Sequence, residues 1–128
     1  MIEGMNKNKG VEGLEVFKRS HHLVLEVYRI TMKFPAVEKF GLIPQMRRAA
    51  ASIPANLMEG GERLGRLEYR RFVSIAKGSA GELKYYFLLG KDLGYISAEE
   101  YSHFRRQMDE VGKMLSGLVK SLSTAKEK

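Results

Sequence analysis

The feature that most constrains the fold of this chain is a regular apolar pattern between Arg66 and Tyr95. Apolar or small residues recur there at spacings of three and four, which is the period of one face of an α-helix. The residues of this face are Tyr69, Phe72, Ala76, Ser79, Leu83, Tyr86, Gly90 and Leu93. The pattern predicts one long helix whose apolar seam packs along other helices of a bundle.

The same stretch carries more apolar residues than one seam requires. Those that flank the seam are Val73, Ile75, Ala80, Phe87 and Leu89, and those on its outer arc are Leu67, Tyr85 and Leu88. An apolar arc of this width exceeds what the neighbours in a small bundle would cover. We therefore expect a second subunit to pack on it.

Basic residues also recur along this stretch, seven positions apart, at Arg63, Arg70, Lys77, Lys84 and Lys91. A spacing of seven keeps side chains on one line of a helix, and we predict that this basic line faces away from the seam. Residues 63–91 hold seven basic and two acidic side chains, which is +5 of the chain's net charge of +7. A concentrated surplus favours a polyanionic partner, although an ordinary solvated helix face would show the same pattern.

Two further helices are expected before this one. The first spans Leu14 to Phe34 and ends because Pro35 disfavours helical geometry in the residue before it. The second spans about Pro44 to Gly60 and contains Pro54, which removes one backbone hydrogen bond. We expect it to end in a left-handed turn at Gly60-Gly61.

A last helix begins at a capping box formed by Ser97 and Glu100. Its seam is regular, with Tyr101, Phe104, Met108, Val111, Leu115, Leu118 and Leu122. Four helices with short links and no strand signal predict an all-α fold, an antiparallel up-and-down four-helix bundle. We expect one domain over residues 11–122, between a disordered tail at 1–10 and a frayed tail at 123–128.

Composition excludes several classes of protein. The chain has no cysteine, so disulfides and thiolate metal sites are ruled out. It has no apolar run near the roughly 20 residues of a membrane helix, and no signal peptide is recognisable. We expect a protein of the cytoplasm with no membrane role.

The histidines do not form a metal-binding or catalytic pattern. His21 and His22 point about 100° apart on a helix and cannot chelate together. We place Glu26, one turn after His22, on the solvent face, and His103 is remote in sequence. We therefore expect no metal site, no cofactor and no catalytic histidine.

Glu82 follows a run of small residues, Gly78-Ser79-Ala80-Gly81. Glycines within a helix cost about 1 kcal/mol each against alanine, and close packing of another helix would offset that cost. We expect Glu82 to be buried or interfacial and to pair with Arg47 or Arg48. A catalytic carboxylate would need a second reactive group that the sequence does not offer, so we expect no enzyme.

Many of these residues occur in an order that resembles one known family. They are Phe34-Pro35, Glu38, Phe40-Gly41-Leu42, Gln45, Arg47-Arg48-Ala49-Ala50, Ser52-Ile53-Pro54, Asn56, Glu59-Gly60, Arg63, Phe72, Ile75-Ala76, Gly78-Ser79, Glu82-Leu83 and Leu93-Gly94-Tyr95. The order resembles that of the bacterial four-helix-bundle proteins first noticed as reading frames in intervening sequences of 23S rRNA genes. The resemblance covers about Leu14 to Leu122. That family is similar in turn to the accessory variability determinant (Avd) of diversity-generating retroelements.

The resemblance implies a four-helix bundle assembled as a ring of five. The accessory determinant is a homopentameric, basic barrel that binds a reverse transcriptase and nucleic acid, so the resemblance implies both as partners. It implies less about activity, because most intervening-sequence members have no assigned reaction. The chain departs from the usual pattern at Ile43-Pro44 and at Leu57-Met58, which leaves its branch of the family open.

We predict a non-catalytic, basic oligomer that binds RNA or DNA mainly through phosphates; its narrowest form is an accessory subunit of a retroelement reverse transcriptase. The alternative is a protein-interaction scaffold with no nucleic-acid role. The predicted phosphate contacts are Arg63, Arg66, Arg70, Arg71, Lys77, Lys84 and Lys91. The residues predicted at an oligomer interface or in structural pairs are Arg47, Arg48, Glu59, Glu82, Tyr85, Phe87 and Leu88.

Overall fold

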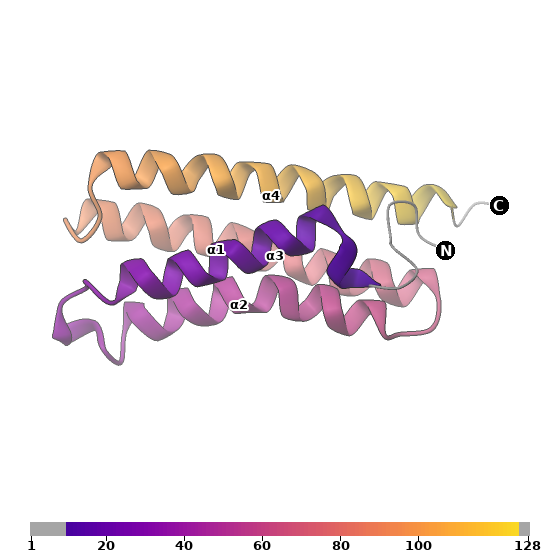
Figure 1. Ribbon diagram of the computed structural model, residues 1–128, viewed down its shortest axis with the longest axis horizontal. Coiled ribbons are helices and arrows are strands. Elements are labelled where there is room, and N and C mark those ends of the chain that lie inside the picture. Colours follow the sequence, from indigo (N-terminus) through magenta and orange to yellow (C-terminus); the bar gives the residue numbers. More distant parts are fainter. Residues whose placement is uncertain (1–9, 126–128) are drawn as a thin grey trace.

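The computed structural model describes residues 10–125, which form four α-helices joined by short connections. The helices are α1 (Glu15–Thr31), α2 (Leu42–Gly61), α3 (Arg66–Asp92) and α4 (Ala98–Ala125). Two short 3-10 helices, η1 (Val11–Gly13) and η2 (Ala36–Glu38), precede α1 and α2. Successive helices run in opposite directions (Figure 1), and none of residues 10–125 lies in a strand. The predicted four-helix bundle is therefore confirmed.

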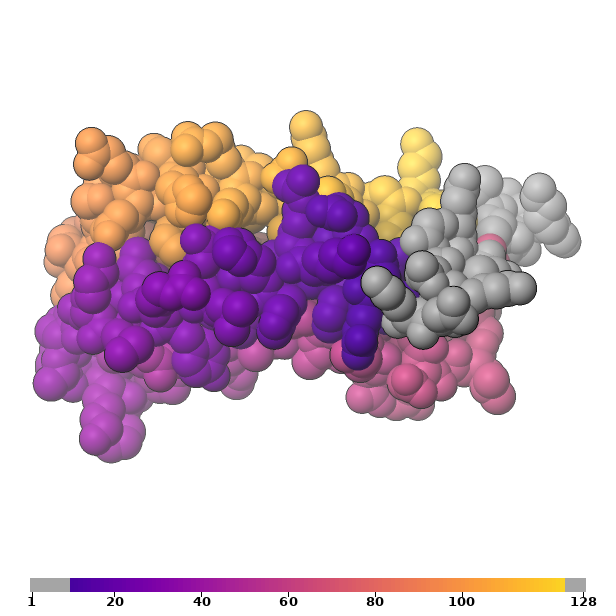
Figure 2. Space-filling view, in the orientation of Figure 1, coloured from indigo at the N-terminus to yellow at the C-terminus, as the bar shows by residue number. Residues whose placement is uncertain are grey.

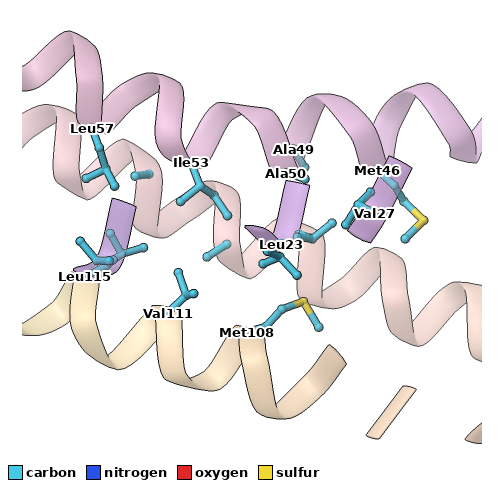
Figure 3. Packing of buried hydrophobic residues seen from close by; sticks show 14 of the residues in the cluster. Leu23, Val27, Met46, Ala49, Ala50, Ile53, Leu57, Met108, Val111 and Leu115 are labelled. Carbon is cyan, nitrogen blue, oxygen red and sulfur yellow. The ribbon is translucent and has the colours of Figure 1, made fainter. Parts of the chain in front are cut away.

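The core runs along the axis of the bundle, where α2 and α4 face each other across α1 (Figure 3). Its labelled members are Leu23, Val27, Met46, Ala49, Ala50, Ile53, Leu57, Met108, Val111 and Leu115, none of which is more than 2% exposed. The two alanines let α2 lie close to its neighbours, as their small volume predicts. On α1 the core side is the line through Leu23 and Val27, whereas Tyr28 is 44% exposed.

Phe87 belongs to this core. Its side chain is fully buried and its ring stacks on Phe104 of α4, with the ring centroids 4.4 Å apart. The prediction that Phe87 lies at an oligomer interface is therefore wrong. The buried face of α3 includes Tyr69, Phe72, Ala76, Leu83 and Gly90 of the predicted seam, and it also takes in Val73, Ala80 and Phe87 beside that seam.

The predicted left-handed turn at Gly60-Gly61 is also wrong. Both glycines close α2, and the positive φ, 95°, falls at Gly65 in the connection to α3. Gly60 is required for a different reason, the close approach of α2 to α3. A Cβ atom there would lie 2.8 Å from Tyr69 Cδ1 and 2.9 Å from the Cβ of Phe72.

The ends of the helices show which sequence signals act as caps. The predicted capping box is confirmed, because the Ser97 backbone N–H donates to Glu100 Oε1 at 2.9 Å and the Glu100 N–H donates to Ser97 Oγ at 3.0 Å. At the start of α2, the Leu42 N–H donates to Glu38 Oε1 at 2.8 Å. A Cβ at Gly41 would lie 2.6 Å from that oxygen, so a side chain there would displace the Glu38 carboxylate from this position.

The two predicted tails lie mostly outside residues 10–125, the part of the chain that the structure describes. The tail predicted at residues 1–10 lies outside the described residues except for Gly10. α4 continues to Ala125, past the predicted start of the second tail at residue 123, and residues 126–128 lie outside the described part. Within residues 10–125, every helix is too short or too polar to cross a membrane.

Candidate nucleic-acid interface

The basic line of α3 lies on the flank of the helix that borders α4. Two contacts fix the register of these antiparallel helices: Arg70 Nη1 donates to Ser123 Oγ at 3.0 Å, and Lys84 Nζ donates to Asp109 Oδ1 at 3.1 Å. Lys77 stands midway between Arg70 and Lys84 on α3, so it lies level with Ser116 of α4. The line is thus beside the seam and shared with a second helix.

α4 contributes cations to the same surface that the sequence analysis did not select. Arg106, Lys113 and Lys120 are exposed and follow one another at the same seven-residue spacing as the line on α3. Lys113 and Lys120 stand one turn to either side of Ser116 and hence of Lys77, about 5 Å along the bundle axis. Cations of the two helices therefore alternate in height.

Carboxylates are missing from the two segments that meet here. Residues 69–81 of α3 contain three basic and no acidic residues, and residues 111–125 of α4 contain two basic and no acidic residues. We call the surface formed by Arg70, Lys77, Lys113 and Lys120 the α3–α4 basic face. No salt bridge of Arg70, Lys77 or Lys113 occurs among residues 10–125, and Lys77 and Lys113 are exposed.

Four of the seven predicted phosphate contacts are instead paired with acids of the same subunit. Lys84 pairs with Asp109 at 3.1 Å, and Lys91 pairs with Asp92 at 3.5 Å. Arg71 pairs with Glu68 at 3.5 Å. The Lys84 ammonium is the main cause that lowers the pKa of Asp109 below its ordinary value. These pairs reduce the positive field along this part of α3.

The fourth paired residue is Arg63. It lies in the α2–α3 connection, whereas the rest of the predicted basic line, Arg70, Lys77, Lys84 and Lys91, lies on α3. Its guanidinium contacts Glu59 at 2.7 Å and lies over the Phe72 ring at 4.9 Å, as does that of Arg71. Arg66 begins α3, and its Nη1 is buried with no hydrogen-bond partner among the described residues. Arg63 and Arg71 thus lie on Phe72 next to the α2–α3 turn.

The arginines predicted to pair with Glu82 have other partners. Arg47 Nε donates to Thr31 Oγ1 at 2.9 Å and its Nη2 donates to the Tyr28 carbonyl at 3.3 Å, so Arg47 caps the end of α1. Arg48 donates to Gln45 Oε1. The prediction of an Arg47–Glu82 or Arg48–Glu82 pair is therefore wrong within the subunit.

Glu82 accepts a hydrogen bond from the Tyr86 hydroxyl at 3.1 Å. Burial and this carboxylate raise the pKa of Tyr86, with burial the larger cause. Further along the same α2–α3 border, Ser52 Oγ and Ser79 Oγ lie 2.8 Å apart, and Asn56 Nδ2 donates to the Ser52 carbonyl at 2.8 Å. The Ser52 hydroxyl therefore links α2 to α3, and Asn56 binds Ser52 from within α2.

The outermost side of α3 is apolar and thinly covered. Leu67, Tyr85 and Leu88 are 55%, 57% and 38% exposed, as their place on the outer arc predicts. A Cβ at Gly78 or Gly81 would meet no other described atom within 4 Å. Gly78 and Gly81 therefore face out of the subunit, and no helix within residues 10–125 packs on them, whereas Ser79 and Ala80 of the same run face α2 and the core.

A second apolar surface lies between α1 and α2. A groove of about 560 Å³ is lined by Phe17, His21, Val24, Ala51, Pro54, Ala55, Met58, Glu59 and Glu62. Toward the α1–α2 connection, which projects from the end of the bundle (Figure 2), Met32, Val37 and Phe40 are 77%, 81% and 90% exposed. Arg47 and Arg48 line the neighbouring hollow of about 580 Å³.

Within the described part of the chain, no three His, Cys, Asp or Glu side chains are gathered so that they could hold a metal ion. The Glu26 side chain is only 18% exposed and its Oε2 lies 3.4 Å from Nε2 of His103, so the prediction that Glu26 lies on the solvent face is wrong.

The α3–α4 basic face is formed by two helix segments, residues 69–81 and 111–125, that hold no carboxylate. The cations of α4 could have been found from the sequence, because Arg106, Lys113 and Lys120 repeat the seven-residue spacing of α3. The sequence could not show which lysines of α3 pair with an acid. That pairing depends on which helices are neighbours and in what register.

Comparison with known proteins gives one family and one fold. Residues 12–117 match the model of a family described as 23S rRNA-intervening sequence protein. The crystal structure of a protein with unknown function from the S23 ribosomal protein family of Bacteroides thetaiotaomicron VPI-5482 superimposes with a TM-score of 0.74. It is 24% identical, and the match covers 82% of this chain and 98% of that chain, which shows a shared fold. The comparison with curated proteins finds no match.

Proposed function

The chain belongs to the family of 23S rRNA-intervening sequence proteins, and from this premise we propose that it is a non-catalytic protein that binds the phosphate backbone of RNA or DNA. The observation that carries the proposal is the α3–α4 basic face, where the acid-free halves of two helices meet. Phosphates are the most common densely charged polyanions, and lysine and arginine side chains neutralise them with little regard for base sequence. Binding is therefore expected to be sequence-tolerant and sensitive to salt.

The proposed contact residues differ from those predicted from the sequence. Lys77, Arg70 and Lys113 are the principal contacts, with Lys120 and Arg106 beside them. Lys84 and Lys91 take a smaller part because each already has a carboxylate within 4 Å. Arg63 and Arg71 act through the α2–α3 turn, because each is paired with a glutamate and lies over Phe72.

The test is a salt series of binding to random-sequence duplex RNA and duplex DNA, followed by fluorescence anisotropy. If about five cations engage phosphates, log K should fall with log salt at a slope near −4 to −5. The double variant Lys77→Gln/Lys113→Gln should reduce that slope by about 2, because each lysine removed takes about one unit with it.

A matched control is Lys18→Gln/Lys39→Gln, which removes the same charge from exposed lysines of α1 and the α1–α2 connection. This variant should keep the wild-type slope to within a few tenths. Equal losses in the two double variants would show that net charge, and not the α3–α4 basic face, governs binding. Absence of binding to either nucleic acid at low salt would refute the proposal.

We also propose that copies of the chain assemble through the outer side of α3, and the resemblance to the accessory determinant supports a ring of five. Leu67, Tyr85 and Leu88 supply apolar area, and Gly78 and Gly81 leave room for a second backbone to approach. Five copies would bring together a formal charge of about +35, and such a field attracts polyanions more strongly than one subunit does.

The assembly is tested by light scattering on the native protein and on two leucine variants. Leu88→Glu should lower the native mass toward that of one subunit. Leu25→Glu should not, although Leu25 of α1 is 46% exposed and Leu88 is 38% exposed. A wild-type protein that is monomeric at tens of micromolar concentration would contradict the assembly.

The second candidate function, a protein-interaction scaffold, is supported by the apolar groove between α1 and α2 and by the exposed Met32, Val37 and Phe40. Failure to bind nucleic acid, together with an intact oligomer, would favour it. The narrower role as accessory subunit of a reverse transcriptase rests on the resemblance alone. A reverse-transcriptase gene beside a variable repeat in the neighbouring DNA would support it.

A further inference from the structure

α1 and α2 lie side by side (Figure 1), and two hollows follow the line between them. The groove of about 560 Å³ described above lies beside the second half of α2, and the hollow of about 580 Å³ lies beside its start. Most of the side chains that line the two are apolar. We call this surface the α1–α2 face. An apolar surface that runs the length of a helix is typical of a contact with another protein molecule.

The middle of this face is made of small residues. Ala51 and Ala55 line the groove, and because they are four positions apart they lie on one line of α2, on the side away from the buried Ile53 and Leu57. Ala55 is exposed and Ala51 is half-buried. The distance at which two helices pack depends on the side chains at their contact, so another helix can approach α2 closely here.

Opposite charges stand at the two ends of the same line. Arg48 near the start of α2 and Glu62 just after its end are both exposed, and among residues 10–125 neither forms a salt bridge. They are 14 positions apart, which is about 21 Å along a helix, so they cannot pair with each other within one subunit. Arg47 and Lys39 lie at the end with Arg48, and Glu59 lies at the end with Glu62. The face is therefore basic at one end and acidic at the other.

The two connections that flank α2 carry the most exposed large apolar side chains among the described residues. Phe40, in the connection before α2, is 90% exposed, and Leu64, in the connection after it, is 94% exposed. Apolar side chains in this position gain free energy when they are removed from water. Cover is therefore needed at both ends of α2 as well as along it.

We propose that the α1–α2 face is a contact between two copies of the chain, related by a twofold axis that passes close to Ala55. In this pair, α2 of one copy lies antiparallel to α2 of the other. Ala55 is seven positions from Arg48 and seven from Glu62, so each Arg48 comes level with the partner's Glu62. The connection that carries Phe40 comes to the same end of the pair as the one that carries the partner's Leu64. The contact leaves the outer side of α3 free and does not depend on the proposed binding to nucleic acid.

The charges favour a second copy over a partner of another kind. A polyanion would meet Glu62 at one end of the face, and a strongly basic protein would meet Arg48 at the other. A second copy in the antiparallel direction carries both charges at the required spacing. In a twofold contact every favourable pair also forms twice, whereas parallel copies would place like charges at the same height.

The pair is tested by light scattering on Leu88→Glu, which removes the contact proposed through α3 and so isolates this one. The mean mass should rise from that of one subunit toward that of two as the protein concentration rises. Added to Leu88→Glu, either Arg48→Glu or Glu62→Arg should weaken the pair about 10-fold, because each brings two like charges together twice.

The charge reversals also allow a rescue. An equal mixture of the Arg48→Glu and Glu62→Arg proteins should pair again, because both contacts then join opposite charges, and so should the double variant Arg48→Glu/Glu62→Arg. Arg106→Glu, an exposed position of α4, is the control and should leave the pair unchanged. A mass of one subunit at every concentration, or reversals without effect, would overturn the pair.

A cross-link tests the position of the axis. The chain has no cysteine, so one introduced thiol can react only with its own copy in another subunit. Ala55→Cys should form a disulfide-linked dimer with oxidised glutathione, since a disulfide requires Cα atoms about 4.4–6.8 Å apart and only positions beside the axis come so close. Ser102→Cys, at an exposed position of α4, should form little. All of these positions are exposed, so the variants are not expected to prevent folding. Equal yields of dimer from the two cysteine variants would overturn the twofold axis at Ala55.

Discussion

Alanine at Gly60 and alanine at Gly78 should change the stability of the subunit in opposite directions, although both glycines lie in helices. Gly60 closes α2 against α3, where the new Cβ would stand 2.8 Å from Tyr69 Cδ1 and 2.9 Å from the Cβ of Phe72. Real Cβ atoms do not approach so closely, so the helices must move apart. Gly78 is in the middle of α3, and its new Cβ would meet nothing within 4 Å among the described atoms.

The magnitudes follow from two opposing effects. Replacing a helical glycine by alanine stabilises the helix by about 0.5–1 kcal/mol, because alanine loses less backbone entropy on folding. Forcing an extra methyl into a packed contact costs about 1–3 kcal/mol. Gly78→Ala should therefore gain about 0.5–1 kcal/mol, and Gly60→Ala should lose a net of about 1–2 kcal/mol. For a chain of 128 residues, 1 kcal/mol corresponds to roughly 4 °C in Tm.

The assay is urea unfolding at several protein concentrations, since association makes the stability of a folded subunit depend on concentration. At high dilution, the midpoint should rise for Gly78→Ala and fall for Gly60→Ala with unchanged m-values. At high concentration, the gain at Gly78 should vanish or reverse if a second copy packs on the outer side of α3. A Gly60→Ala protein as stable as wild type would refute the close approach of α2 and α3. A loss at Gly78 that persists at every dilution would refute the open outer face.

Three further outcomes follow from individual side chains. Phe87→Ala should cost about 3–5 kcal/mol in urea unfolding because it empties a core site, whereas Tyr85→Ala, on the exposed side, should cost about 0.5 kcal/mol or less. Arg47→Met should lower stability by about 1 kcal/mol in the same assay, because the end of α1 loses its cap. The Lys33 ammonium, with help from the Ser97 N–H, lowers the pKa of Glu100, so the contribution of this carboxylate is present at neutral pH and is lost as the pH falls through the lowered value. Glu100→Gln should therefore lower Tm at pH 7 and flatten its decline below about pH 4.5.

Signals that act within one helix could be read from the sequence. The period of the α3 seam predicted a buried helix, and Ser97 with Glu100 predicted the start of α4, because both depend on residues three or four apart. The seam also predicted which side of α3 is buried, because Tyr69, Phe72, Ala76, Leu83 and Gly90 lie in the buried face. It could not show that the flanking Phe87 is buried as well, since that depends on contact with Phe104 of α4.

Signals that act between helices could not be read. Lys84 and Asp109 are 25 positions apart, and Glu26 and His103 are 77 apart. Each pair forms because antiparallel packing brings two turns to the same height, and a difference of one turn in register would separate them. The sequence therefore predicted a basic line on α3 but could not show which of its cations are neutralised.

The register also explains why the basic surface is confined to one half of the α3–α4 pair. Where the end of α3 meets the start of α4, acids and bases alternate, and Lys84 and Arg105 share Asp109. Where the start of α3 meets the end of α4, both segments lack carboxylates, so Lys77 and Lys113 have no acid of their own helices to pair with. The ion pairs of Lys84 and Arg105 with Asp109 thus occupy one half, and Lys77 and Lys113, which have no salt bridge among residues 10–125, occupy the other. Lys77→Gln/Lys113→Gln should therefore weaken nucleic-acid binding without lowering Tm, whereas Asp109→Asn should lower Tm and should not weaken binding, because it releases Lys84.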